Sequence, residues 1–374
     1  MDTNRHNPFQ RGRSIPGAAG PRPERPTPGA HGDPLPLGEA PVAVAPAAED
    51  LPEILRPGSL IAGFEVLKSL GRRGLAWALE AREISQERCV LLKVLDPRLA
   101  SNGSAHVRLR AEAGLAARVD HPCIQAVLSR GAAAGLEFYT EPLPAGPTLK
   151  EYLEGLPDFR GEDHYRDLAI RFAALSRAVR ALHGAGIIHR GIEPSAIILE
   201  EGRLILGNFA AALELSPAGN QDPRERPEER FAGHGLARSP AHLAPEEFVQ
   251  GGPLDLRSDI YSLGMTLYET AAGILPFPVI APEGMGRLKL TRRPIAPRRL
   301  NPEIPLGLEA VIRQAIEESP LLRHGTAEEL ACDLERFAAC KRGTARRHHL
   351  DPWSAGMPPD DGGGEELRDM ARIA

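Results

Sequence analysis

Cysteine is scarce in this sequence. The 374 residues include only four, none of which forms a Cys-x-x-Cys pair: Cys89, Cys123, Cys332 and Cys340. No histidines stand at a spacing that would complete a tetrahedral site, so a structural zinc ion has no ligand set. Scattered thiols of this kind are typical of a reducing compartment. We therefore expect a cytoplasmic protein without a disulfide framework.

Long apolar runs and an excess of positive charge are also missing. Residues 1–20 carry three arginines and lack the apolar core of a signal peptide. The longest uncharged apolar stretch, residues 270–282, is too short to cross a bilayer and contains three prolines. The net charge of -5 provides no overall basic field that would gather phosphate backbones. We expect neither a membrane nor a nucleic acid as a partner.

Aromatic residues are few, and the first 57 residues contain a single one, Phe9. The same segment holds 12 of the 36 prolines. It cannot bury enough apolar surface to offset the entropy of the chain. A second tail begins near residue 341 and ends in an acidic, glycine-rich stretch. We predict a disordered Pro-rich arm at residues 1–57, a folded domain at residues 58–340 and a disordered tail at residues 341–374.

What the folded part does contain is, first, a series of strand patterns. Runs rich in β-formers cover residues 64–70, 77–81 and 89–95, with turn residues between them, and shorter candidates cover residues 124–128 and 136–141. A helical pattern that includes Leu109, Glu112 and Leu115 follows the third run. This predicts a first lobe, about residues 58–142, made of a five-stranded antiparallel sheet plus one helix.

After a Pro-rich joint at residues 142–147 the periodicity becomes helical. The clearest stripe runs from Leu168 to Leu182, with apolar residues spaced four, three, four and three apart. Further helices are predicted over residues 260–271, 308–317 and 326–337. The second lobe, about residues 148–340, is therefore mainly helical, and the fold class is α+β.

Several short motifs follow one another in order along this domain. After a glycine-containing hairpin and Lys93 come His189-Arg190-Gly191, Asn208-Phe209-Ala210, Ala244-Pro245-Glu246 and Ser258-Asp259. Together they resemble the protein kinase catalytic domain over about residues 64–337, and among kinases most of all the bacterial Ser/Thr kinases. The resemblance implies a bilobal protein-kinase-like fold with a nucleotide cleft.

Some nucleotide-binding positions of the family are kept. Lys93 matches the lysine that holds the α- and β-phosphates, and Glu112 matches its partner on the helix. At the hinge, the resemblance gives Glu141 a carbonyl and Leu143 an amide facing a purine, with the Thr140 side chain at the back of the pocket. ATP or ADP could therefore bind, or the lysine and the glutamate could form a structural ion pair alone.

The phosphate loop is already degraded. Gly71 keeps the first glycine of the motif, but Arg73 and Ala76 replace the second and the third. Side chains at these positions restrict the backbone where it must approach phosphate closely. Arg72 and Arg73 could touch phosphate from outside or belong to a solvated turn.

The catalytic positions depart further from the family. Gly191 stands where an aspartate accepts the proton of the substrate hydroxyl, and Glu193 stands where a lysine steadies the γ-phosphate. Ala196 and Asn208 stand where the two magnesium ligands belong. No catalytic residue is intact, and magnesium is not expected. Glu193, or Glu200 and Glu201 in the adjacent loop, could act as a displaced acid.

Residues that hold the architecture of the family remain. By resemblance, Asp259 anchors the backbone of the catalytic loop, Glu246 pairs with Arg323, and His189 packs into the core between them. Arg190 could receive a phosphorylated side chain, with Ser216 or Ser239 as candidates, or it could pair with a local glutamate.

Two functions therefore compete. The first is a pseudokinase, a regulatory or scaffolding module that recruits other proteins, such as an active kinase or its substrate, and could hold ATP as a structural ligand. The alternative is a divergent Ser/Thr kinase that phosphorylates proteins with a displaced carboxylate. The sequence favours the first, because Gly191, Glu193, Ala196 and Asn208 depart from the family at one site.

Overall fold

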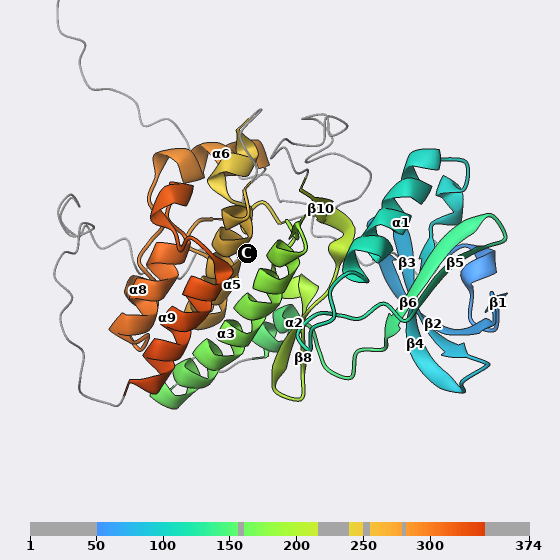
Figure 1. Cartoon of the computed structure of the whole chain (residues 1–374), viewed down its shortest axis with the longest axis horizontal. Helices are drawn as coiled ribbons and strands as arrows, with labels where there is room; N and C mark the ends of the chain where they lie inside the picture. The colour runs from blue at the N-terminus through green and yellow to red at the C-terminus, as the bar shows by residue number, and fades with distance from the viewer. Residues whose placement is uncertain (1–50, 156–160, 216–238, 250–254, 279–281, 341–374) are drawn as a thin grey trace, which may run out of the picture. The chain divides into compact units, whose positions relative to one another are not determined.

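The computed structural model describes residues 51–155, 161–215, 239–249, 255–278 and 282–340 (Figure 1). Within these residues, the first part of the chain forms one antiparallel sheet in the order β1-β2-β3-β4-β6-β5. Its strands are β1 (Leu60–Ile61), β2 (Phe64–Arg73), β3 (Ala76–Glu83), β4 (Arg88–Leu95), β5 (Ser129–Ala133) and β6 (Leu136–Pro142).

The predicted sheet has five strands, and the observed sheet has six. Strands β2, β3, β4 and β6 lie over their predicted ranges, and the short edge strand β1 is an addition. The strand predicted at residues 124–128 is wrong. Gln125 donates its backbone N–H to the carbonyl of Leu206 at 2.8 Å, so this segment joins the second part of the chain, and β5 begins only at Ser129.

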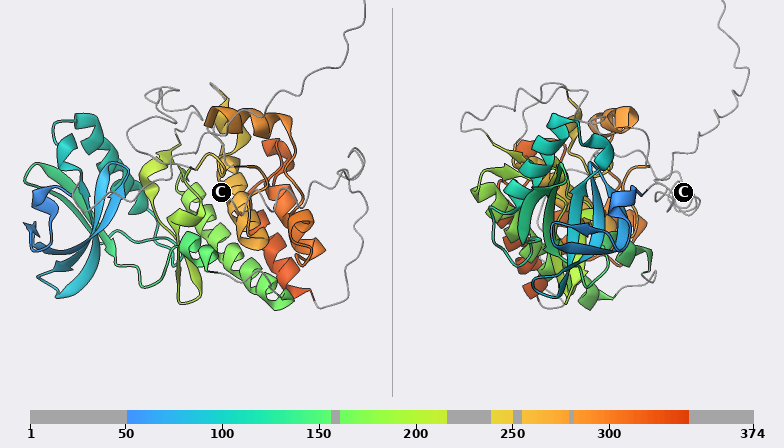
Figure 2. Two further views of the ribbon diagram at one scale, coloured as in Figure 1. Left: turned by 180° about the vertical axis from the view of Figure 1, so that it is seen from behind. Right: turned by 90° about the vertical axis from the view of Figure 1, so that its right-hand side faces the viewer.

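The side chains of β4 alternate between two differently covered faces. Val90, Leu92 and Val94 point into an apolar core on one face. The other face carries Leu95 and is covered by helix α1 (Gly103–Ala116), which lies against β4 and β6 (Figure 2). Because alternate residues share a face, Lys93 lies on the side of α1.

The predicted boundary between arm and domain is too late in the sequence. A turn of 3-10 helix, η2 (Glu53–Leu55), precedes β1, and Leu55 is fully buried in the sheet core beside Ile61 and Phe64. An apolar residue that completes the core of a lobe cannot belong to a solvated arm. The folded unit therefore includes residues 51–57. Residues 1–50 and 341–374, where the disordered segments were predicted, lie outside the described residues.

The second part of the chain is built around four long helices that lie side by side (Figures 1 and 2). Each covers a predicted helical range: α3 (Glu162–Gly184), α5 (Arg257–Ala272), α8 (Leu306–Ala315) and α9 (Ala327–Ala339). The apolar stripe of α3 is buried throughout. Gly273 ends α5 in the left-handed region, with φ of 79°, and the Thr326 hydroxyl accepts the N–H of Glu329 to begin α9.

Short elements connect these helices and carry the candidate site. They are α2 (Leu149–Glu154), β7 (Ile187–Ile188), η4 (Pro194–Ala196), β8 (Ile197–Glu200), β9 (Arg203–Leu206), η5 (Phe209–Ala211), β10 (Leu213–Glu214), η6 (Pro245–Phe248), α6 (Pro282–Thr291), α7 (Pro297–Leu300) and η7 (Pro320–Leu322); η3 (Pro97–Leu99) lies between β4 and α1. The antiparallel pair β7–β10 and the hairpin β8–β9 flank the motif residues. Helix α1 contacts η5, so the two parts of the chain meet at this point.

Candidate functional site

Lys93 lies at the centre of a buried cluster of charged and polar side chains. It is 6% exposed. Its Nζ lies 3.4 Å from a carboxylate oxygen of Glu112 and 3.4 Å from one of Glu141, and it donates to the Tyr139 hydroxyl at 2.7 Å. Tyr139 in turn donates to Glu112 at 2.5 Å. The Lys93–Glu112 contact predicted from the sequence is present, but the ammonium has two further partners that the sequence did not indicate.

The hinge prediction is wrong by one residue. Lys93 pairs across the sheet with Tyr139, and Leu91 pairs with Glu141, so the Glu141 side chain lies on the face that bears Lys93. Thr140 lies on the opposite face, where its hydroxyl bonds that of Ser129 at 2.7 Å. A shift of one residue moves a side chain to the other face of a sheet. Glu141 therefore occupies the place predicted for Thr140 at the back of the cleft.

The same shift changes the backbone groups of the hinge. The carbonyl and amide predicted at Glu141 and Leu143 move to Pro142 and Pro144. The Pro142 carbonyl accepts a hydrogen bond from the side-chain amide of Gln125 at 2.8 Å. Pro144 has no N–H to donate. At these two positions the hinge therefore has no N–H for a purine, and its carbonyl already accepts one hydrogen bond.

The cluster around Lys93 has one cation between two carboxyls. Burial alone would lower the pKa of the Lys93 ammonium, but the charges of Glu141 and Glu112 outweigh it, and the pKa lies above its usual value. Burial raises the pKa of the Glu141 carboxyl, with Glu112 adding to the effect and Lys93 opposing it. Burial and the two neighbouring carboxyls hold the pKa of Tyr139 well above its usual range, so its hydroxyl remains a donor.

The loop between β2 and β3 forms a tight hairpin. Gly71 and Gly74 have φ of 98° and 61°, which glycine adopts without strain. Arg72 is not simply solvated, because its Nε lies 3.3 Å from the buried carboxylate of Asp96. Arg73 lies near enough to Glu141 for its charge to act on that carboxyl, opposing the rise in its pKa. Both arginines therefore face acids of this chain.

The catalytic-loop backbone is anchored by Asp259, as predicted. This fully buried carboxylate accepts the backbone N–H groups of His189 and Arg190, each at 2.8 Å, and contacts Nε2 of His183 at 2.9 Å. Burial would raise the pKa of Asp259, but its hydrogen bond and charge contact with His183, together with His189, hold it below its usual value. The loop is thereby fixed in place, with Arg190 at φ of 59°.

Gly191 leaves no acid at the position of the missing base. Its N–H donates to Nδ1 of His189 at 3.2 Å, and the other ring nitrogen of His189 bonds the carbonyl of Gly207 at 3.1 Å. The His189 ring packs edge-on against Phe209, with ring centres 4.8 Å apart. A Cβ added at Gly191 would approach no atom closer than 3.7 Å. The site therefore has room for a side chain.

The remaining altered positions carry no free carboxylate. One oxygen of Glu193 accepts the Ser195 hydroxyl, and the other accepts the Ser239 N–H at 2.8 Å. Ala196 is buried in η4. Asn208 precedes η5 in the left-handed region, with φ of 59°, a conformation that asparagine tolerates well. Among the described residues, no group of three or more His, Cys, Asp and Glu side chains is placed to hold a metal ion.

Two further ion pairs stabilise the segment after the catalytic loop. Arg323 binds Glu246 through two parallel contacts, 2.7 and 2.8 Å long, which confirms the predicted pair. Arg190 is 3% exposed, and its Nε lies 3.7 Å from a carboxylate oxygen of Glu247, so it has the local glutamate expected as one alternative. Ser216, one of the two candidate phosphorylation sites, lies outside the described residues.

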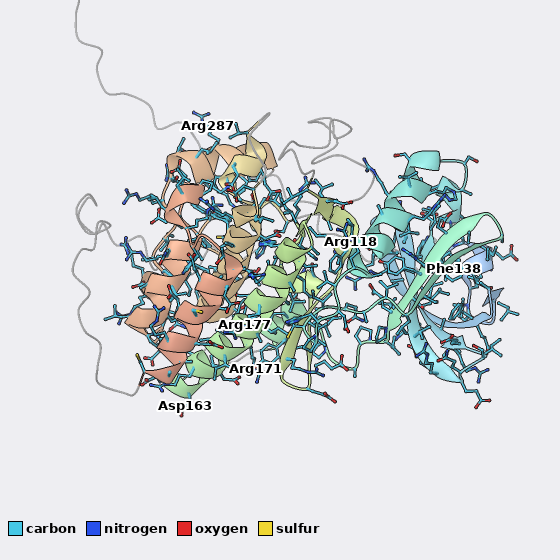
Figure 3. All side chains as sticks on the ribbon, in the orientation of Figure 1. Arg118, Phe138, Asp163, Arg171, Arg177 and Arg287 are labelled. Carbon is cyan, nitrogen blue, oxygen red and sulfur yellow. The ribbon has the colours of Figure 1, made fainter. Side chains whose placement is uncertain are left out.

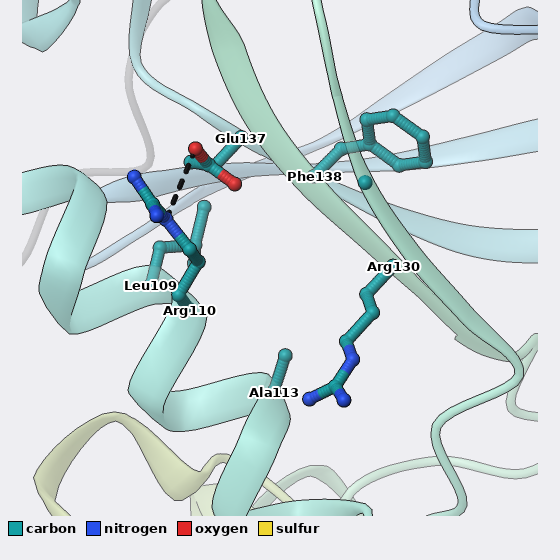
Figure 4. Close-up of a pocket in the computed structure, with 7 residues that line it drawn as sticks. Leu109, Arg110, Ala113, Arg130, Glu137 and Phe138 are labelled. Atoms are coloured by element: carbon teal, nitrogen blue, oxygen red, sulfur yellow. Dashed lines mark ion pairs between the residues drawn. The ribbon is translucent and has the colours of Figure 1, made fainter.

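A separate pocket of about 250 Å³ lies between α1 and the strands β5 and β6 (Figure 4). Its apolar lining includes Leu109, Ala113 and Phe138. Arg110 borders it and pairs with Glu137 at 3.1 Å. The residues that line this pocket include none of the predicted nucleotide-binding residues.

Comparison with known proteins identifies the family. A model of the protein kinase domain matches residues 64–334. The chain belongs to the protein kinase family. Serine/threonine-protein kinase PknB of Mycolicibacterium smegmatis is 31% identical over 323 residues, which cover 84% of this chain and 49% of PknB. PrkC of Bacillus subtilis is 27% identical over 280 residues, covering 74% of this chain and 41% of PrkC.

Solved kinase structures show the same fold. The kinase domain of Mycobacterium tuberculosis PknI superposes with a TM-score of 0.57 at 24% identity, covering 76% of this chain and 100% of that one. Since the chain spans half or less of the length of PknB and PrkC, its likeness to them concerns the kinase domain. No described helix is long and apolar enough to cross a membrane.

Two members of the kinase cleft were missed in the sequence. Tyr139 and the Glu141 side chain face Lys93 because β6 pairs with β4 in the observed register. That register depends on tertiary contacts, and alternation within residues 136–141 is compatible with either face. Figure 3 shows the described side chains on the ribbon, with Phe138 of β6 labelled.

Proposed function

We propose that this kinase domain is a pseudokinase that acts as a regulatory or scaffolding module in the cytoplasm. The observation that carries the proposal is the absence of a free carboxylate at Gly191, Ala196 and Asn208, in a loop that Asp259 otherwise holds in place. Phosphoryl transfer requires a base beside the hydroxyl and an acid on the magnesium ion. Neither requirement has a candidate at these positions.

The expected loss of rate is large. A positioned base typically contributes about 10²–10⁴ in rate. A metal ion that neutralises the transferred phosphoryl group contributes a further several kcal/mol. These contributions do not add when residues act as a unit. A loss of about 10⁴ alone would reduce a typical turnover of about 10 per second to about 10⁻³ per second.

Glu193 is a poor replacement for the lost acid. Both of its oxygens already accept hydrogen bonds, one from Ser195 and one from the backbone of Ser239. A carboxylate engaged by these two donors is held away from the alignment with a substrate hydroxyl that proton transfer requires. Its bond to Ser239 instead ties the catalytic loop to the segment that leads into η6, and so supports a fixed surface.

The retained architecture suits binding. The Asp259 anchor and the Arg323–Glu246 pair keep the segment around η6 in place without any catalytic use. We propose other proteins as partners, in particular an active kinase or one of its substrates, and neither nucleic acid nor a membrane. The curated relatives extend beyond the region that matches this chain, so the parts outside the match do not indicate a partner for it.

The second candidate is a divergent Ser/Thr kinase, and the family comparison favours it. Both curated relatives described above, PknB and PrkC, carry names of Ser/Thr protein kinases. An active enzyme here would depend on a displaced carboxylate, of which Glu193 is the one closest in sequence to Gly191.

Mass spectrometry of phosphorylated residues separates the two candidates. The full chain is incubated with Mg²⁺ and ATP, alone and with a mixed peptide library, beside Glu193→Gln and Glu200→Gln variants. We expect no phosphorylated residue in any sample. Phosphorylation that is lost in Glu193→Gln and kept in Glu200→Gln would establish the divergent kinase instead.

A further inference from the structure

The back of the nucleotide cleft is filled by an acidic side chain of the chain itself. Glu141 is 3% exposed, and its carboxylate lies 3.4 Å from the ammonium of Lys93. Register places it on the cleft face of β6, next to Leu91 of β4. A nucleotide would bring phosphates to the same ammonium, so phosphate and the Glu141 carboxylate compete for one cation.

Lys93 has few donors left for a ligand. An ammonium has three N–H groups, and here Tyr139, Glu112 and Glu141 surround them at 2.7, 3.4 and 3.4 Å. The cluster already contains two carboxyls for one lysine. An added polyanion would place further negative charge beside two buried carboxyls that already share this ammonium.

The hinge adds a second obstacle for a purine. Pro144 lacks the N–H that the shifted register requires, and the Pro142 carbonyl already accepts one hydrogen bond from the side chain of Gln125. A buried purine edge with an unpaired acceptor binds more weakly, because that acceptor has lost its water without gaining a donor. The hinge therefore does not orient the purine, and the Lys93 cluster does not neutralise the phosphates.

Arg73 connects the glycine hairpin with the opposite wall. It stands where the second glycine of the phosphate loop belongs, and its charge acts on two acids, Glu141 in β6 and Glu151 in α2. Glu151 belongs to the second part of the chain, after the hinge. The charge of Arg73 thus acts on one acid before the hinge and on one after it in the sequence.

We propose that Glu141 is an internal occupant of the nucleotide cleft, which excludes ATP and ADP and holds α1 against the sheet in their absence. This proposal rests on the proposed function, which left nucleotide binding open, and it goes beyond the loss of catalysis. The Lys93, Glu112, Tyr139 and Glu141 contacts then join the apolar packing of α1 on the sheet in holding the helix, without a nucleotide. The surfaces that α1 presents to a partner would not vary with cellular ATP.

Equilibrium binding of ADP to the full chain tests this assignment. ADP is titrated without metal into the wild type, into a Glu141→Thr, Pro144→Ala double variant and into a Thr140→Val control, with heat of binding and thermal shift as readouts. Lys93 keeps Glu112 and Tyr139 as partners in the double variant, so its fold should persist, which circular dichroism checks. We expect no detectable binding by the wild type or the control up to about 1 mM ADP. The double variant should bind ADP with a Kd at least about tenfold below that concentration.

Two results would overturn the assignment. One is wild-type ADP binding with a Kd of roughly 100 μM or below. The other is a folded double variant that binds ADP no better than the wild type. If the double variant does not fold, Pro144→Ala alone and the wild-type titration still decide the matter. Phosphorylation measured on the same samples separates this assignment from the proposed function: ADP binding without phosphorylation defeats only the former.

Discussion

The Lys93→Met substitution provides a sharp test of the buried cluster, because in an active kinase the same change removes phosphate binding and here it should remove stability. The ammonium is 6% exposed and faces two carboxyls at 3.4 Å. At an effective dielectric constant of about 20, one such contact is worth roughly 5 kcal/mol. Desolvation offsets much of this, and measured losses for removing one partner of a buried pair are about 3–5 kcal/mol. Methionine keeps most of the volume, so packing changes little.

Urea unfolding of the full chain measures this loss, with Lys68→Met as the control. Lys68 lies exposed in β2, and its substitution should change the free energy of unfolding by less than about 0.5 kcal/mol. We expect Lys93→Met to lose about 3–5 kcal/mol at pH 7.5, or about 10 °C in Tm. A loss below about 1 kcal/mol, similar to that of the control, would refute the assigned electrostatic role.

The loss should also depend on pH in a defined direction. Without Lys93, burial raises the pKa of Glu141 further above its value in the unfolded chain, which is about 4.3. A carboxyl whose folded pKa is raised destabilises the fold as pH rises above the unfolded value. The difference between wild type and Lys93→Met should therefore be smaller at pH 5 than at pH 7.5. An equal difference at both values would exclude Glu141 as the group left unpaired.

Three further predictions concern the second part of the chain. Burial lowers the pKa of Lys289 to about 7, so above pH 7 the unfolded chain binds more protons than the folded one. The free energy of unfolding, measured with urea, should therefore rise between pH 7 and pH 9 by up to about 1.4 kcal/mol per pH unit. The Lys289→Met variant should lack this slope. In thermal unfolding, Arg323→Ala should lower the stability by about 3–5 kcal/mol, because it leaves the Glu246 carboxylate without its cation. The control Arg177→Ala removes an exposed ion pair and should lower the stability by less than about 1 kcal/mol. Gly264→Ala should cost about 1–3 kcal/mol, because the added methyl would lie 2.7 Å from a side-chain carbon of α8; Gly103→Ala, with open space, should not destabilise in the same assay.

Local patterns in the sequence were enough to predict most of the fold. The stripe from Leu168 to Leu182 marks α3, and the glycine at position 273 marks the end of α5, because both depend on short-range spacing and backbone preference. The contacts of Asp259 and of Arg323 with Glu246 also followed from ordered motifs. The helix features depend on spacing over a few residues, and the contacts depend on motif residues that can be recognised one by one.

The features that escaped depend on how distant segments pair. The register of β6 against β4 decides whether Thr140 or Glu141 faces Lys93, and nothing in residues 136–142 alone fixes it. Leu55 lies in a Pro-rich segment whose composition suggests disorder, yet it is buried by the sheet that follows. In both cases tertiary packing overrides the local pattern, so the arm boundary and the back of the cleft needed the structure.

The central claim is that the cleft lacks the acids needed to seat a divalent cation and to accept a proton from an alcohol. The most direct measurement is the single-turnover rate of phosphate transfer from radiolabelled ATP by the full chain, with Mg²⁺ or Mn²⁺, beside a Gly191→Asp, Asn208→Asp variant. Gly191 has room for the new side chain. We predict that wild-type transfer equals the background without protein under both metals. A wild-type rate above background that saturates with ATP and disappears when the metal is chelated would contradict the claim.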